Sequence, residues 1–264
     1  MVRVMQTTLP RLAIEEKANL SENESMSIIS GTAGVRPPTA LVDLGPIAQL
    51  RAGRLGRRVP QLLIGLVLYG VSLAMMLRGA LGLAPWDVLH SGFIRHVPMT
   101  IGQAVVLFSF IVLIFWIPLK EKPGIGTIAN AFIVGMSADA TLAVLAPGDG
   151  MVARIALALG GVALCGMASA LYIGAQFGRG PRDGLMTGLA RRTGLSLRLV
   201  RTGLEVLVVV LGLALGGVLG VGTVLYAVLI GPLTQLMLPW FTVDLPGAVD
   251  LTSAGSPVGG DASR

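Results

Sequence analysis

The chain has 264 residues, of which 53% are apolar and only 13% are charged, and its mean hydropathy is +0.79. Soluble domains carry about 25% charged residues, so this composition excludes an ordinary water-soluble domain, and its high hydropathy excludes a disordered chain. The formal net charge of +6 fits either a nucleic-acid-binding protein or the basic loops of a membrane protein. The positions of the charges must decide between these two classes.

Six apolar segments approach the length of about 20 residues that a helix needs to cross a bilayer. In chain order they cover residues 60–81, 101–119, 124–145, 152–177, 199–219 and 222–241. Proline, glycine or charged residues stand at every junction, as in the run from Lys120 to Pro123. We therefore predict an all-α membrane protein with about six transmembrane helices.

Most basic residues fall in three segments: before the first span, between spans two and three, and between spans four and five. They are Arg51, Arg54, Arg57, Arg58, Lys120, Lys122, Arg179, Arg182, Arg191, Arg192 and Arg198. With six spans and a cytoplasmic N-terminus, all three segments lie on the cytoplasmic side, as the positive-inside rule requires. Topology therefore explains the positive charge, and we expect no nucleic-acid partner and a cytoplasmic C-terminus.

The spans belong to an internal repeat. Residues 61–145 align without a gap to residues 157–241 at a constant offset of 96, and the identities fall mainly on glycine, proline and aspartate. The matched pairs include Pro85 with Pro181, Asp87 with Asp183, Gly92 with Gly188, Gly126 with Gly222, and Thr127 with Thr223. We predict a membrane repeat over 59–146, a second over 147–242, and disordered tails over 1–58 and 243–264.

Each repeat holds three predicted spans, and an odd number turns the second copy upside down in the membrane. The predicted architecture is therefore a 3+3 inverted repeat, a plan common among secondary transporters. Two similar halves of this kind can exchange inward-facing and outward-facing states. The plan favours a permease for a small solute or ion, although a fold by itself does not establish a function.

A duplicated motif follows the first span of each repeat, with Pro85-Trp86-Asp87 in the first copy and Pro181-Arg182-Asp183 in the second. The proline ends the preceding span, and aspartate is a favoured N-cap. We predict a short interfacial or re-entrant helix after each motif. Since Arg182 replaces Trp86, the two copies need not be equivalent.

The motifs resemble those of the YczE/YyaS/YitT-type family of bacterial integral membrane proteins, and are closest to the YczE branch. The resemblance rests on residues 82–92, on Gly124-Ile-Gly126-Thr127, and on the run from Gly220 to Pro232, within a similarity that covers about residues 60–241. It implies a multi-pass protein of the bacterial cytoplasmic membrane. It brings no secure substrate or reaction.

Ionisable residues in or beside the spans are the candidate site. Asp87 and Asp183 would gate a path from both membrane faces or bind a cation or proton, and the alternative is helix capping. Arg78 and Asp139 lie near the outer ends of their spans and would pair there, either as a substrate site or as a structural pin. Arg78 alternatively extends to the interface.

Two further polar residues complete the predicted path. Glu205 follows Arg201 by four residues, so a local ion pair is the simplest interpretation and a proton-coupling carboxylate is the alternative. Asn130 shares a helix face with Thr127, which would line a polar path or hydrogen-bond between packed spans. We interpret His90 as an interfacial side chain.

The sequence contains no phosphate-binding GxxxxGK[ST] motif, no HExxH and no GxSxG, so we expect no enzyme, cofactor or metal site. The preferred function is a small-solute or ion permease working by alternating access. The alternative is a non-transporting scaffold or regulator of another membrane protein. Expected partners are the lipid bilayer, a small solute or ion, and a further copy of the chain or another membrane protein.

Overall fold

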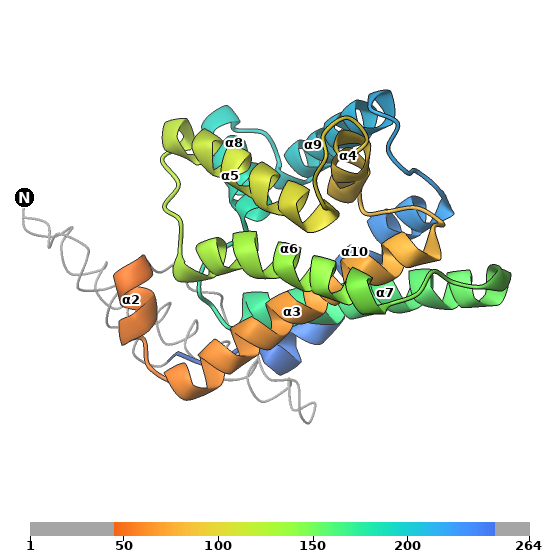
Figure 1. Cartoon of the computed structure of the whole chain (residues 1–264). Coiled ribbons are helices and arrows are strands. Elements are labelled where there is room, and N and C mark those ends of the chain that lie inside the picture. Colours follow the sequence, from red (N-terminus) through yellow and green to blue (C-terminus); the bar gives the residue numbers. More distant parts are fainter. Residues whose placement is uncertain (1–44, 246–264) are drawn as a thin grey trace, which may run out of the picture. The chain divides into compact units, whose positions relative to one another are not determined.

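The computed structural model describes residues 45–245, and the predicted tails lie largely outside this part of the chain. The described residues form helices joined by short loops (Figure 1). In chain order the helices are α2 (Pro46–Arg51), α3 (Leu55–Gly79), α4 (Pro85–Phe93), α5 (Ile101–Leu119), α6 (Ile125–Val144), α7 (Gly150–Gly174), α8 (Pro181–Thr193), α9 (Leu197–Ala214) and α10 (Val221–Phe241).

Each of the six predicted spans corresponds to one long helix. Five of these helices, α3, α5, α6, α7 and α10, are long and apolar enough to cross a membrane. The remaining one, α9, carries Arg198, Arg201 and Glu205 within its 18 residues, and these charges reduce its apolar character. The all-α membrane architecture is confirmed, whereas the sixth crossing stays a prediction.

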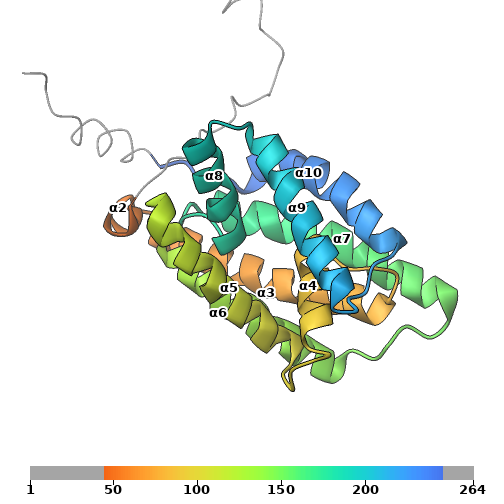
Figure 2. The same cartoon turned by 90° about the horizontal axis from the view of Figure 1, so that it is seen from above.

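The helices form two layers. Helices α3, α6, α7 and α10 pack on one another in the first layer, and α4, α5, α8 and α9 form the second. Viewed from above, the second layer covers the first (Figure 2). The short helices exchange partners between the two halves of the chain, since α4 packs on α9 and α8 packs on α5.

The breaks before the two short helices are built alike. The amide of Gly126 donates to the carbonyl of Phe177 at 2.8 Å, and the amide of Gly222 donates to the carbonyl of Leu81 at 2.7 Å. Gly222 follows Gly126 by 96 positions, and Phe177 follows Leu81 by the same number. The breaks also contain Gly82 and Gly178, which adopt φ of 124° and 100°, a region that residues with a Cβ rarely occupy. Gly82 and Gly178 are therefore required by backbone geometry.

Two arginines hold these breaks in place. Arg58 is fully buried, and its guanidinium donates to the carbonyls of Ala175 and Gln176 at 2.9 and 2.8 Å. Arg154, 96 residues later, donates to the carbonyls of Gly79 and Ala80 at 3.0 and 2.8 Å. Each arginine thus caps the carboxyl end of the first long helix of the other half.

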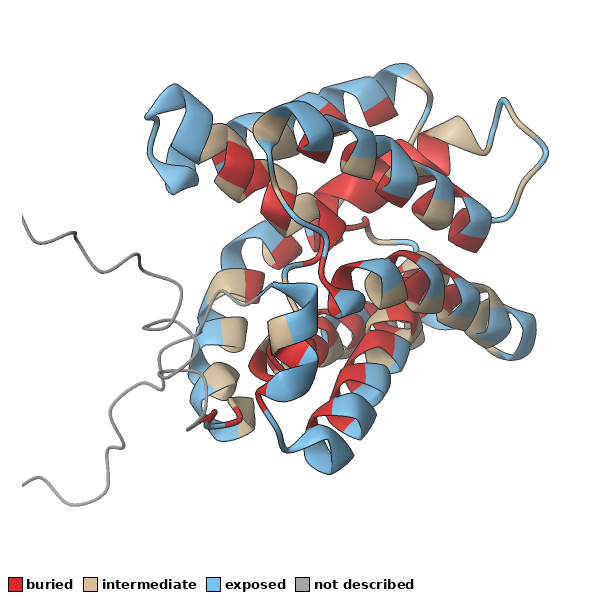
Figure 3. Cartoon of the chain, turned by 90° about the vertical axis from the view of Figure 1, so that its left-hand side faces the viewer, coloured by how far each residue is buried: buried red, intermediate tan, exposed pale blue. Residues whose placement is uncertain are grey.

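The outward faces of the long helices are apolar. Figure 3 shows buried residues where the helices face one another and exposed residues around the outside. Large exposed side chains on this outside include Ile117, Met136, Val152, Val221 and Trp240. In water such a surface would be unstable, whereas in a bilayer it matches the lipid chains.

Candidate functional site

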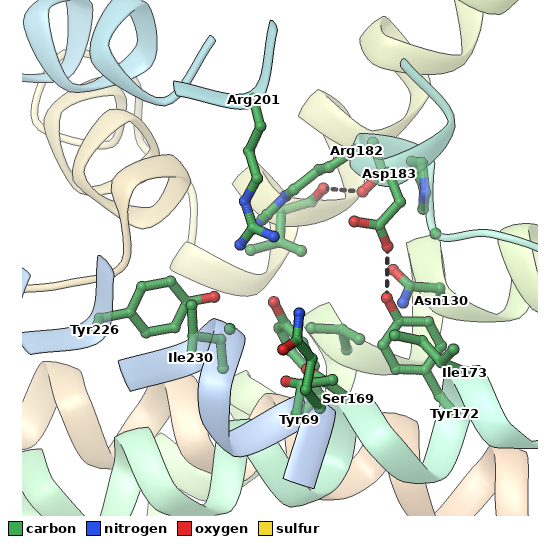
Figure 4. Close-up of a pocket in the computed structure, with 18 residues that line it drawn as sticks. Tyr69, Asn130, Ser169, Tyr172, Ile173, Arg182, Asp183, Arg201, Tyr226 and Ile230 are labelled. Carbon is green, nitrogen blue, oxygen red and sulfur yellow. Dashed lines mark hydrogen bonds between the residues drawn. The ribbon is translucent and has the colours of Figure 1, made fainter. Parts of the chain in front are cut away.

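A polar cavity of about 190 Å³ lies where the layers meet. Its walls come from both halves of the chain: α3, α5 and α6 from the first half, and α7, α8, α9 and α10 from the second (Figure 4). The polar side chains in these walls are Tyr69, Ser109, Asn130, Ser169, Tyr172, Arg182, Asp183, Arg201, Tyr226, Thr234 and Gln235. Polar groups at this density are costly inside a membrane protein unless they serve a water-filled path or a ligand.

Three aromatic hydroxyl groups converge on the cavity. The chain has three tyrosines, and all three, Tyr69, Tyr172 and Tyr226, line this one space. The Tyr172 hydroxyl donates to a carboxylate oxygen of Asp183 at 2.6 Å. Tyrosines in membrane proteins are enriched at the interfaces with water, so their convergence on an internal cavity marks it as polar.

Three charged side chains reach the cavity from the second half of the chain: Arg182, Asp183 and Arg201. In Figure 4 both guanidinium groups point into the space, and the Asp183 carboxylate points towards Tyr172. Arg201 is also held by Glu205 at 3.0 Å. That contact confirms the predicted local ion pair. Glu205 lines a smaller adjoining cavity of about 50 Å³.

The two copies of the duplicated motif meet beside the cavity. A guanidinium nitrogen of Arg182 lies 3.5 Å from a carboxylate oxygen of Asp87, and the guanidinium stands over the Trp86 ring, 5.2 Å from its centre. Arg182 and Trp86 occupy equivalent positions in the two repeats. The substitution that distinguishes the copies therefore creates the contact that joins them.

Asp87 also pairs with His90, whose Nδ1 lies 3.0 Å away. Burial raises the pKa of Asp87, but the hydrogen bond with His90 and the charge of Arg182 outweigh it and bring the pKa below its ordinary value. Burial lowers the pKa of His90, against the opposing effect of Asp87. These effects favour the charged form of Asp87 and the uncharged form of His90.

Two interpretations of the motif are wrong. Neither Asp87 nor Asp183 caps its helix, because each is the third helical residue and α4 and α8 have no side-chain cap. His90 is fully buried and not interfacial, as is nearly all of α4. Helix α4 packs on α9 and α5, so packing inside the protein replaces the surface position that its apolar face suggested.

The predicted pair of Arg78 and Asp139 does not form. Arg78 donates to the Leu142 carbonyl, while Asp139 accepts from the Thr100 hydroxyl and, at 2.9 Å, from the Gly102 amide. Asp139 thus satisfies the amino end of α5, a favourable position for a negative charge. Neither residue lines the polar cavity.

The remaining predicted residues either line the cavity or stabilise the backbone around it. Asn130 lines the cavity. Thr127 is fully buried, accepts from the Gly124 amide at 3.0 Å and donates to the Arg179 carbonyl at 2.6 Å. Thr223 accepts from the Gly220 amide at 3.4 Å. The Gly-x-Gly-Thr motifs are therefore structural, and they hold the breaks before α8 and α4.

Sequence reasoning missed the tyrosines and gave Arg201 no role beyond its partner Glu205. A usable signal was present in the repeat itself. Arg201 stands opposite Val105, and Tyr226 opposite Asn130, in the 96-residue offset. A comparison that seeks differences between the copies, rather than identities, would have selected these positions.

Comparisons with known proteins place the chain among membrane proteins. A family model described as a family of unknown function, DUF6198, matches residues 56–239. A Haemophilus influenzae protein is 39% identical over 67% of this chain and 81% of its own length. The uncharacterised membrane protein YczE of Bacillus subtilis is 30% identical over 66% of this chain and 82% of its own, and YyaS of the same organism is 28% identical over 67% and 90%. No solved structure matches the chain.

Proposed function

We propose that this chain, which belongs to the family DUF6198, is a permease that moves a small solute across the bacterial cytoplasmic membrane. The observation that carries the proposal is the polar cavity between the two halves of an integral membrane protein. In secondary transporters the substrate site typically lies between structural repeats, next to helices that are broken within the membrane. The proposal assigns no chemical reaction and no cofactor to the chain.

The contacts within the chain support an inverted 3+3 repeat. The crossing of α3 and α7 uses Gly65 against residues 168–172 and Gly161 against Ser72 and Met76, and these two sets differ by the 96-residue offset. The arginine caps and the hydrogen bonds at the breaks follow the same offset. Two halves that interlock through reciprocal contacts can rock against each other, and this motion is the basis of alternating access.

Helix α9 completes the second repeat in this proposal. Its charges have local reasons, since Arg201 faces the cavity and pairs with Glu205. Its outer face is apolar and exposed at Val206, Leu207 and Val210. The equivalent helix α5 meets every requirement of a span. A sixth crossing also keeps the basic segments on the cytoplasmic side, together with both termini.

A cavity-filling substitution tests the permease directly. A Cβ added at Gly231, which lines the cavity, meets no atom within 4 Å. We expect Gly231→Phe to fold and to reduce uptake by about tenfold or more, because the ring occupies the space that positions the solute. Uptake is measured by mass spectrometry in proteoliposomes that contain the full chain and face a broad panel of small metabolites.

Gly203→Phe is the matched control. Gly203 also has open space around its Cβ position, but it lies on the exposed face of α9 and does not line the cavity. It should keep the uptake of the unmodified chain. Folded protein that accumulates no member of the panel would contradict the permease proposal, and a stably co-purifying membrane protein would then favour a scaffold or regulator.

A further inference from the structure

The charged groups around the cavity are unequally balanced. Arg182 lies 3.5 Å from Asp87, and Arg201 lies 3.0 Å from Glu205, so each guanidinium has a carboxylate partner. Neither partner lines the main cavity. Each arginine thus has a carboxylate partner outside the main cavity, while its remaining N–H groups stay available to the cavity.

Asp183 has no such partner. Within residues 45–245, no lysine, arginine or histidine nitrogen forms an ion pair with its carboxylate, which receives only the Tyr172 hydroxyl. Arg182 and Arg201 are each engaged by another carboxylate, so Asp183 is the carboxylate at this cavity without a cation from the described residues in ion-pairing distance. Coulomb attraction therefore favours a cationic group of a bound solute beside this carboxylate.

The arginines provide the opposite chemistry. A guanidinium has five N–H donors, and those of Arg182 and Arg201 that their partners leave unused reach the same cavity as the Tyr226 hydroxyl. Such a planar array of donors matches a carboxylate, which accepts two parallel hydrogen bonds. Figure 4 shows both arginines directed into the space and Asp183 turned towards Tyr172. The cavity thus offers a donor-rich region and an anionic region within one small volume.

We propose that this cavity binds a small zwitterionic solute of the amino-acid type. The ammonium group of the solute lies at Asp183, and its carboxylate lies at Arg182 and Arg201. The volume of about 190 Å³ is below the roughly 300–1,000 Å³ of sites for drug-sized ligands, so the solute is small. This assignment rests on the proposed permease function of the same site.

Solutes with one charge fit less well for a physical reason. A simple carboxylate leaves Asp183 unpaired and adds a second negative charge close to it. A simple amine leaves the guanidinium donors without an acceptor and brings a cation next to them. A site whose polar groups remain unpaired discriminates strongly against the incomplete analogue.

Matched sets of compounds test the assignment in proteoliposomes of the full chain. Each set contains a zwitterion, the hydroxy acid that replaces its ammonium, and the amine that lacks its carboxylate: glycine, glycolate and methylamine; alanine, lactate and ethylamine; serine, glycerate and ethanolamine. We expect at least one zwitterion to bind, and to be taken up, about tenfold or more better than both of its analogues. Binding is measured separately on the purified chain in detergent.

A charge-neutralising variant tests the role of Asp183. Asp183→Asn should lose about tenfold or more of its affinity for the zwitterion, while the affinity for the matched hydroxy acid stays the same or improves. A purely structural role would instead weaken both compounds alike. Asp149→Asn is the control, because Asp149 is exposed in the loop before α7 and does not line the cavity; it should change neither affinity.

The outcomes separate this inference from the permease proposal. Uptake of a hydroxy acid or an amine in preference to every zwitterion would overturn the substrate class and keep the permease. Binding of a zwitterion without uptake would keep the substrate class and overturn the permease. Failure to bind any of the three zwitterions would overturn the substrate class, and the broader metabolite panel then decides the permease alone.

Discussion

Arg58 shows how a single side chain stabilises the junction between the two halves of the molecule. Its guanidinium donates to the carbonyls of Gln49, Ala175 and Gln176 and lies 4.3 Å from the centre of the Phe177 ring. One fully buried side chain near the start of α3 thereby joins α2 to the carboxyl end of α7. Arg154 makes the equivalent contacts from a partly exposed position.

The difference in burial gives the first prediction. Arg58→Gln should lower the stability by about 3 kcal/mol or more, because buried carbonyl groups left without donors cost about 1–3 kcal/mol each. Arg154→Gln should cost about 1 kcal/mol or less, because water reaches the carbonyl groups that it leaves. Unfolding of both variants in the same detergent measures the difference, and equal losses would contradict the role assigned to burial.

His90 gives a prediction for pH. Its pKa is lowered in the folded chain, so its contribution to stability is complete above the unfolded value of about 6.5 and is lost as the pH falls towards the folded pKa. Between pH 7.5 and 5.5 the free energy of unfolding should therefore fall, by at most about 1.4 kcal/mol per pH unit from this group, and the melting temperature should fall with it. His90→Gln should flatten the profile. His96→Gln, at the exposed second histidine, should leave it unchanged, and a flat profile in the unmodified chain would refute the assignment.

The cavity residues explain why the site was harder to predict than the fold. Gly82, Pro85 and Thr127 act through their own backbone conformation or their nearest turn, so their chemistry is visible in the sequence. Arg182 acts through Asp87, which is distant in the sequence. Arg201 acts through a cavity that forms only after seven helices have packed. A search for repeated identities passes over both, because each differs from its counterpart in the other half.

At the scale of elements, apolar length predicts helices well and says little about their neighbours. The predicted segment 101–119 coincides with α5, because Thr100 caps its start and Lys120 ends it in a left-handed conformation. The short helix α4 lies where the proline motif predicts one, but it packs on α9 from the other half. That contact depends on tertiary packing. Its only sign in the sequence is a small residue, Gly212, at the point where the two helices meet.

Two glycines on α9 test this packing. A Cβ on Gly212 would lie 2.6–2.8 Å from backbone atoms of Val88 and Leu89, whereas a Cβ on Gly203 meets nothing within 4 Å. Gly212→Ala should destabilise the chain by about 1–3 kcal/mol, because backbone cannot move aside cheaply. Gly203→Ala should be neutral or stabilising by up to about 1 kcal/mol, since alanine favours helix. Thermal unfolding of the two variants gives opposite signs, and equal behaviour would show that α4 and α9 are not in tight contact.

At the scale of the whole molecule, the 96-residue offset connects composition, packing and the proposed function. The same offset relates the glycines of the breaks, the arginine caps and the crossing of α3 with α7. The chemical groups of the cavity do not follow it, since the charged members come from the second half. Most duplicated residues thus form the frame, whereas the arginines and tyrosines of the candidate site differ between the copies; Asp183, which matches Asp87, belongs to both sets.

The membrane orientation that this plan requires can be decided at the two ends of α9. Leu195 and Leu219 are exposed to similar extents, 49% and 47%, and they lie just before and just after this helix. The chain has one cysteine, Cys165, which is buried, so a Cys165→Ala background allows single cysteines to be introduced. If α9 crosses the membrane, an impermeant maleimide applied to intact cells labels the Leu219→Cys chain, and it labels the Leu195→Cys chain only after permeabilisation. Asp149→Cys and Lys120→Cys mark the outer and cytoplasmic sides as controls. Labelling of Leu195→Cys and Leu219→Cys from the same side would show that α9 does not cross, and the inverted 3+3 repeat would then be wrong.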